Sequence, residues 1–108
     1  MKAIPETQLQ RITEQLAFIA FEWRPVKGRY IRPDGGWLPT WRFSPFDRIE
    51  DALQVLEKTA DDYKLHGNKH GHRGSIEVTV GTKTISASGE PKARLITTAL
   101  TYALGLAS

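Results

Sequence analysis

The sequence predicts an α+β fold in which three helices pack on a small antiparallel sheet. Three segments repeat apolar residues at helical spacing, and the segment Ser75 to Val80 alternates apolar and polar residues before a glycine turn. The order helix, short strands, helix, hairpin, helix favours an antiparallel sheet over a parallel α/β fold. At 108 residues, the chain is expected to form a single domain over residues 1–108.

The first helix is predicted from apolar positions that recur in steps of three and four. They are Leu9, Ile12, Leu16, Ile19 and Trp23. Pro5 and Glu6 suit the first turn, because proline loses no hydrogen bond there and an acid favours the positive end of the helix. Pro25 should end the helix.

The second helix has a start signal in Ser44, Pro45 and Asp47, which fit the cap, the first position and the third. Its buried stripe is predicted as Phe46, Ile49, Leu53, Leu56 and Ala60, and we expect it to end between Tyr63 and His66. In the last helix, we expect Ser88 as the cap and Pro91 in the first turn. Its predicted stripe is Ile96, Ala99, Leu100, Ala103 and Leu104.

The hairpin is predicted from a two-residue turn at Gly81-Thr82. This turn sets Val80 opposite Lys83, Val78 opposite Ile85 and Ile76 opposite Ala87, so the apolar residues share one face. Farther upstream, residues 28–32 and 37–43 should form short extended segments around the turn 33–36. Pro39 then requires an edge or a bulge.

Composition narrows the classes of function. The chain has no cysteine, which excludes disulfides, thiolate nucleophiles and sulfur-based zinc sites. It shows no apolar stretch that fits a signal peptide or a membrane span, so we expect a cytoplasmic protein of the host cell, without membrane association. The net charge of +3 permits nucleic acid or an anionic ligand as a partner without requiring either.

Two phrases in the second half of the chain resemble the phage ABA sandwich domain. They are WRFSPFDRIEDALQVLEK from Trp41 to Lys58 and EPKARLITTAL from Glu90 to Leu100. The resemblance implies a small phage or prophage protein without an established common activity. It also implies a sheet between helical layers, which requires the segment from Trp37 to Phe43 to join the hairpin.

The segment from Ser75 to Leu104 also resembles the end of double-stranded-RNA-binding domains, where a strand, a turn, a strand and a helix follow in that order. This resemblance implies phosphate contacts from Lys69, Arg73 and Lys92. Where consecutive lysines would open the last helix, this chain has Glu90 and Pro91.

Candidate binding residues lie in two basic segments, Trp23 to Phe46 and the loop from His66 to Gly74. The first segment could form an aromatic and cationic surface, although tryptophan also fills small cores, so we expect either Trp37 or Trp41, or both, to be buried. The loop could hold an anion on its backbone N–H groups or a metal on its histidines, but a solvated connector explains it more simply. The candidates are Arg29, Arg32, Trp37, Trp41, Arg42, Lys69, His70, His72 and Arg73.

The sequence contains no motif for nucleophilic catalysis or for a metallohydrolase, and we expect neither an enzyme nor a bound cofactor or metal. The paired acids Glu50-Asp51 and Asp61-Asp62 are interpreted as a solvated helix face. The leading hypothesis is a phage-type accessory protein that binds a host protein or an anionic small ligand. The alternatives are a domain that binds double-stranded nucleic acid and a structural domain that forms homo-oligomers.

Overall fold

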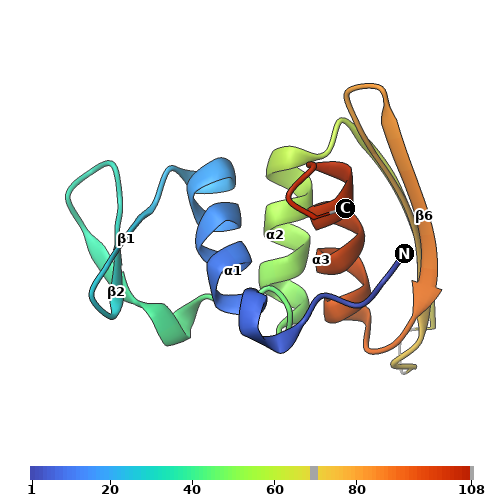
Figure 1. The fold of residues 1–108 in the computed structure, drawn as a ribbon, viewed down its shortest axis with the longest axis horizontal. Coiled ribbons are helices and arrows are strands. Elements are labelled where there is room, and N and C mark those ends of the chain that lie inside the picture. Colours follow the sequence, from blue (N-terminus) through green and yellow to red (C-terminus); the bar gives the residue numbers. More distant parts are fainter. Residues whose placement is uncertain (69–70, 108) are drawn as a thin grey trace.

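The computed structural model has a row of three helices between two small sheets (Figure 1). It describes residues 1–68 and 71–107. The helices are α1 (Glu6–Phe21), α2 (Ile49–Thr59) and α3 (Lys92–Ala103), with a short 3-10 turn at Thr40–Arg42. The first sheet contains β1 (Arg24–Val26), β2 (Arg29–Ile31) and β3 (Trp37–Pro39), and the second contains β4 (Asp62–Gly67), β5 (Gly74–Val80) and β6 (Lys83–Gly89).

The predicted α+β class is confirmed, but the layer order implied by the family resemblance is wrong. The segment from Trp37 to Phe43 does not join the hairpin, because β3 pairs with β2 in a separate sheet. The elements instead follow one another as large sheet, α3, α2, α1 and small sheet (Figure 1). Pro39 lies in β3 at an edge of its sheet, as its missing N–H group requires. Within the described residues, no helix is long and apolar enough to cross a membrane.

The predicted start of α1 is confirmed, since the helix begins at Glu6 directly after Pro5. Its buried residues are Ile12, Thr13, Leu16 and Ala17. Ile19 was predicted to share the apolar stripe of this helix, but it is 44% exposed. At 3.6 residues per turn, Ile19 lies roughly a quarter-turn from the centre of the buried face.

Both predicted ends of the second helix are wrong. The Ser44 hydroxyl does donate to Asp47 (2.8 Å), but this contact closes a separate turn, and α2 begins only at Ile49. The helix ends at Thr59 because Ala60 is already extended, with φ −79° and ψ 140°. Residues predicted as the last helical turn form β4 instead, where Tyr63 pairs with Val78 and Leu65 with Ile76.

The hairpin between β5 and β6 has the predicted register. Val80 pairs with Lys83, Val78 with Ile85 and Ile76 with Ala87. Gly81 has a φ of +61°, a backbone conformation that other residues adopt at a cost. Agreement between the turn and the alternation of side chains explains why this register could be predicted.

Helix α3 is the most buried element of the fold. Its predicted cap is wrong, because Ser88 lies in β6 opposite Ser75 and the helix begins at Lys92, after Pro91. Nine of its twelve residues are buried, so burial extends well beyond the predicted stripe. The Thr97 hydroxyl donates to the carbonyl of Pro45 (2.5 Å), and the Thr101 hydroxyl donates to the carbonyl of Thr97 (2.6 Å).

The N-terminal segment is held against α3. The Tyr102 hydroxyl donates to the carbonyl of Lys2 (2.9 Å), and Ile4 is buried in the core. A guanidinium nitrogen of Arg94 lies 3.0 Å from a carboxylate oxygen of Glu6. These contacts fix the start of α1 relative to α3.

The bond between Thr97 and Pro45 generates a stability prediction. Thr97→Val keeps the shape of the side chain but leaves a buried carbonyl without its partner, so we expect unfolding free energy to fall by about 1 to 3 kcal/mol in urea titrations. Thr101→Val is the matched control and should cost less than about 1 kcal/mol, since the Thr97 carbonyl keeps its helical hydrogen bond. Equal losses in the two variants would contradict the account.

Candidate functional site

The small sheet is anchored to the end of α1 by a cluster of aromatic rings. Phe21 stacks on Trp23 with ring centroids 4.6 Å apart, and Phe43 meets the Trp23 ring edge-on at 5.6 Å. Tyr30 in β2 contacts the same Phe43 ring at 6.0 Å and is completely buried. Because these rings fill the inner side of the sheet, other aromatic residues of this segment remain outside.

Both Trp37 and Trp41 are exposed, so the prediction that one or both are buried is wrong. Their side chains are 56% and 66% exposed, respectively. Trp23, Tyr30 and Phe43 occupy the space that a buried tryptophan would need. Two exposed tryptophans on so small a protein are a feature that interfaces use.

An arginine side chain packs against the ring of each exposed tryptophan. The guanidinium carbon of Arg29 lies 5.0 Å from the ring centroid of Trp37, and that of Arg42 lies 5.4 Å from the ring centroid of Trp41. Both distances are within the range of cation–π attraction. We refer to the five residues Arg29, Arg32, Trp37, Trp41 and Arg42 as the arginine–tryptophan face.

A groove of about 440 Å³ lies next to this face. Three members of the face, Arg32, Trp37 and Arg42, line it together with apolar residues of the aromatic cluster and with two polar residues of α2. The other lining residues are Trp23, Leu38, Pro39, Phe43, Asp51 and Gln54. Apolar side chains and separated charges therefore meet in one concave surface.

Asp51 and Gln54 belong to this groove, and the sequence did not point to them. Asp51 was interpreted as part of a solvated helix face, but one of its oxygens accepts the N–H of Ser44 (2.9 Å). This bond ties the start of α2 to the segment that carries Phe43. The only signal for the pair is their i, i+3 spacing, which places them on one side of α2.

Among the described residues, no ion pair joins Arg32 or Arg42 to Asp51, the acid that lines the groove. The Nε atom of Arg32 lies 3.7 Å from a carboxylate oxygen of Asp34, and both side chains are largely exposed. Such an exposed pair is weak and can exchange for a stronger partner. Arg32 can therefore turn toward an anion in the groove.

The basic loop lies away from this face, at the far side of the row of helices (Figure 1). Of its candidate residues, His72 and Arg73 are exposed, whereas Lys69 and His70 lie outside the described residues. The two basic segments thus do not form one continuous positive face. In the described part of the chain, no group of three or more histidines or acids could hold a metal ion.

The basic loop does approach the start of α3. The Lys92 ammonium group donates to the carbonyl of Asn68. The Lys92 side chain also lies over Gly67, where an added Cβ would be 2.9 Å from its Cε atom. Lys92 and Arg73 are therefore brought to the same end of the large sheet.

Tyr30 has a buried hydroxyl that finds no hydrogen-bond partner among the described residues. Burial raises the pKa of Tyr30 to about 12, and the negative charge of Glu14 adds to this rise. The Gln10 side chain lowers the pKa in part, without the geometry of a full hydrogen bond. The Tyr30 side chain is therefore a neutral phenol beneath the small sheet.

The whole chain is similar in fold to a phage protein from Bacillus cereus ATCC 14579, known from a 2.0 Å crystal structure. The two chains superpose with a TM-score of 0.68 over 97% of this chain and 92% of the other, at 18% sequence identity. No family model and no curated protein matches the sequence. The predicted resemblance to a phage protein therefore agrees with the fold, and membership of the phage ABA sandwich family stays a prediction.

The exposure of the tryptophans predicts how they contribute to stability. Trp37→Ala and Trp41→Ala should each change the unfolding free energy by less than about 1 kcal/mol, because their rings face solvent. Trp23→Ala should cost about 3 kcal/mol, since its ring packs between Phe21 and Phe43. Urea unfolding measures all three, and a large loss for Trp37→Ala would show that the ring has a core role.

The raised pKa of Tyr30 predicts a loss of stability in alkali. The folded state holds this proton more tightly than the unfolded state, so stability should be intact below pH 10 and should fall as the pH rises from 10 to about 12. Tyr30→Phe removes this loss, and it raises stability at neutral pH by about 1 kcal/mol because an unpaired buried hydroxyl disappears.

Urea unfolding at several pH values measures this effect, with Tyr102→Phe as the control. The Tyr102 hydroxyl already has a partner in the Lys2 carbonyl, so its removal should not stabilise the protein. If Tyr30→Phe lowered stability at neutral pH, the hydroxyl would have to be paired and the assignment would be wrong.

Proposed function

We propose that the protein is a small accessory protein of phage or prophage origin that binds an anionic partner through the arginine–tryptophan face. The observation that carries the proposal is the pair of exposed tryptophans, each with an arginine against its ring. The similarity in fold to a phage protein from Bacillus cereus supports the origin. The protein acts by binding and catalyses no reaction. It acts in the cytoplasm of the host cell.

The partner we propose is an acidic segment of a host protein. Tryptophan and arginine are the residues that contribute most to binding at protein interfaces. In the groove, the side chains of Trp23, Leu38 and Phe43 can receive an apolar side chain, while Arg32 and Arg42 can pair with acids on either side of it. A short segment with an apolar residue between acidic ones matches this arrangement.

The proposal can be tested with designed peptides and the tryptophan fluorescence of the natural protein, because two of its three tryptophans, Trp37 and Trp41, are exposed. A peptide with glutamates around a leucine should change the emission saturably and should bind more weakly as salt increases. A matched peptide with lysines in place of the glutamates should cause no change. Neutralising Arg32 and Arg42 to alanine should remove the binding, while Lys83→Ala, in β6 on the other side of the row of helices, should not.

An acidic segment as the partner is ruled out if the emission does not respond to the acidic peptide, or if it responds equally when both arginines are replaced. Equal binding of the acidic and basic peptides would indicate a purely apolar groove. An anionic small ligand remains within the proposal if a nucleotide raises the melting temperature and the double arginine variant loses that shift.

A second candidate function is binding of double-stranded nucleic acid. The observation that favours it is the approach of Lys92 to the basic loop, next to Gly67 and Gly74. Replacing Lys69, Arg73 and Lys92 with alanine should then abolish binding to duplex RNA or DNA and reduce its salt dependence. If neither duplex binds the natural protein at low salt, this candidate is eliminated, whatever the result for the arginine–tryptophan face.

A further inference from the structure

The last strand of the large sheet, β6, has one edge without a neighbouring strand. In this sheet β5 lies in the middle, so β4 and β6 are both edge strands, as β1 and β3 are in the small sheet. The unpaired backbone groups of an edge attract other strands. Proteins usually protect such an edge with proline, with charged residues or by keeping the strand short.

Three of the four edge strands have this protection, and β6 does not. In the small sheet, β1 contains Pro25 and β3 contains Pro39, and each of these strands has only three residues. In the large sheet, β4 has ionisable side chains at alternate positions, which are Asp62, Lys64 and His66. By contrast, β6 has seven residues without proline, and its one charged residue, Lys83, stands at its start.

The backbone of β6 presents its unpaired groups at every second residue. The Thr79 carbonyl in β5 accepts the N–H of Asp61, so Thr79 directs its backbone groups toward β4. Thr84 lies opposite Thr79 and must therefore direct its own N–H and C=O away from β5. The hydroxyl oxygens of Thr79 and Thr84 lie 2.9 Å apart, as the close side chains of a non-hydrogen-bonded pair allow. Because this orientation recurs at every second residue, Thr84, Ser86 and Ser88 all direct these groups to the outer edge.

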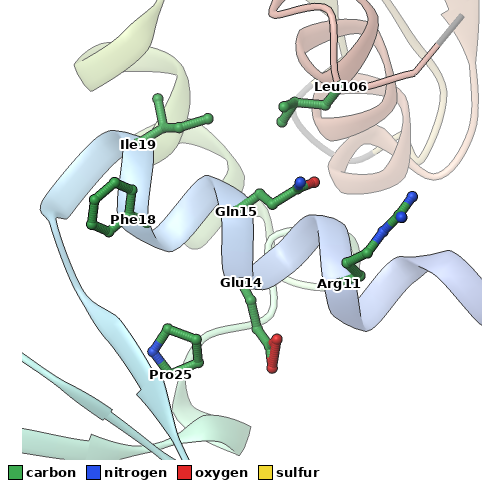
Figure 2. Close-up of a pocket in the computed structure, with 7 residues that line it drawn as sticks. All are labelled: Arg11, Glu14, Gln15, Phe18, Ile19, Pro25 and Leu106. Atoms are coloured by element: carbon green, nitrogen blue, oxygen red, sulfur yellow. The ribbon is translucent and has the colours of Figure 1, made fainter.

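Both ends of the described chain are held elsewhere. The Tyr102 hydroxyl binds the carbonyl of Lys2 and keeps the N-terminal segment against α3. The C-terminal segment extends toward α1, where Leu106 lies in one groove with Ile19 (Figure 2). Within residues 1–68 and 71–107, no backbone hydrogen bond from another segment reaches the outer edge of β6.

We infer that β6 pairs with β6 of a second copy, antiparallel about a two-fold axis at Ser86. This pairing places Thr84 opposite Ser88 and Ser86 opposite Ser86, so the outward N–H and C=O groups of both copies meet. All seven residues of β6 are then paired, with Lys83 opposite Gly89 at each end. A shift by two residues pairs only five residues, and a shift by one sets outward groups opposite inward ones.

The side chains also match in this register. On the face toward α3, Ile85 lies opposite Ala87, and both residues are only half-buried in a single copy. On the other face, only the hydroxyl side chains of Thr84, Ser86 and Ser88 meet. No charged residue lies from Thr84 to Gly89, so no like charges meet across the pair. A strand of another protein would have to supply this match, whereas a second copy always does.

The dimer would have one continuous sheet of six strands. Its interface consists mainly of one strand pair, while stable complexes usually bury about 1,200 Å² or more, so the dimer should dissociate on dilution. The small sheet lies at the opposite end of the row of helices, which leaves the arginine–tryptophan face free in both copies (Figure 1). Two free faces would strengthen attachment to a partner with repeated sites.

Sedimentation velocity over a range of concentrations tests the dimer with two variants at one position. Ser86→Pro removes the N–H at the centre of the interface but no hydrogen bond to β5, because this N–H points outward. It should raise the dissociation constant at least about tenfold, since two hydrogen bonds between the copies are lost. Ser86→Ala is the matched control: it keeps the N–H and should dimerise as the natural protein does. Circular dichroism checks that both variants are folded.

Hydrogen exchange in the natural protein locates the interface without a substitution. The amides of Thr84, Ser86 and Ser88 should be protected at concentrations where the dimer forms and should lose this protection on dilution. Protection of the Leu65 amide, on the outer side of β4, should not depend on concentration. A natural protein that stays monomeric would leave the edge to a strand of another protein and would overturn the inference. A dimer that Ser86→Pro leaves intact, or one without protection of β6, would overturn it as well.

Discussion

The burial of α3 is the constraint on which the rest of the structure depends. One side of this helix covers β5 and β6, and the other contacts α2, so nine of its residues are removed from solvent. Thr97 links α3 to the segment before α2, because its hydroxyl donates a hydrogen bond to the carbonyl of Pro45. The N-terminal segment is held by Tyr102 of the same helix. Helix α2 is thus positioned by direct contact with α3, and α1 in turn packs on α2.

The small sheet depends on this core only indirectly, through rings at the end of α1. Its strands are three residues long, and a sheet of that size is not stable without packing. Phe21, Trp23 and Phe43 supply this packing, and Tyr30 is enclosed by them. The two exposed tryptophans of this segment therefore lie outside the main core and contribute little to it.

Local sequence patterns correctly predicted those parts of the fold for which two independent patterns indicate the same structure. The hairpin register followed from both the turn at Gly81 and the alternation of Ile76, Val78 and Val80. By contrast, the first residues of β4 were predicted as the end of the second helix, because the helical spacing of apolar residues continues through Leu56 to Ala60. These residues form a strand because Tyr63 pairs with Val78, and a partner so distant in the sequence cannot be predicted from local spacing. The exposure of Trp37 and Trp41 likewise depends on which residues fill the core, and these are Trp23, Tyr30 and Phe43. The place of Asp51 in the groove depends on the packing of α2 beside this segment.

Native-state hydrogen exchange tests the central role of α3 most directly, since it measures the opening free energy of each backbone amide. The account predicts that amides of α3 and β5 exchange only by global unfolding. Amides of β1 to β3 should exchange through a smaller opening with a clearly lower free energy. If the small sheet were protected as strongly as α3, or if α3 exchanged before it, the core would lie elsewhere and the account would be wrong.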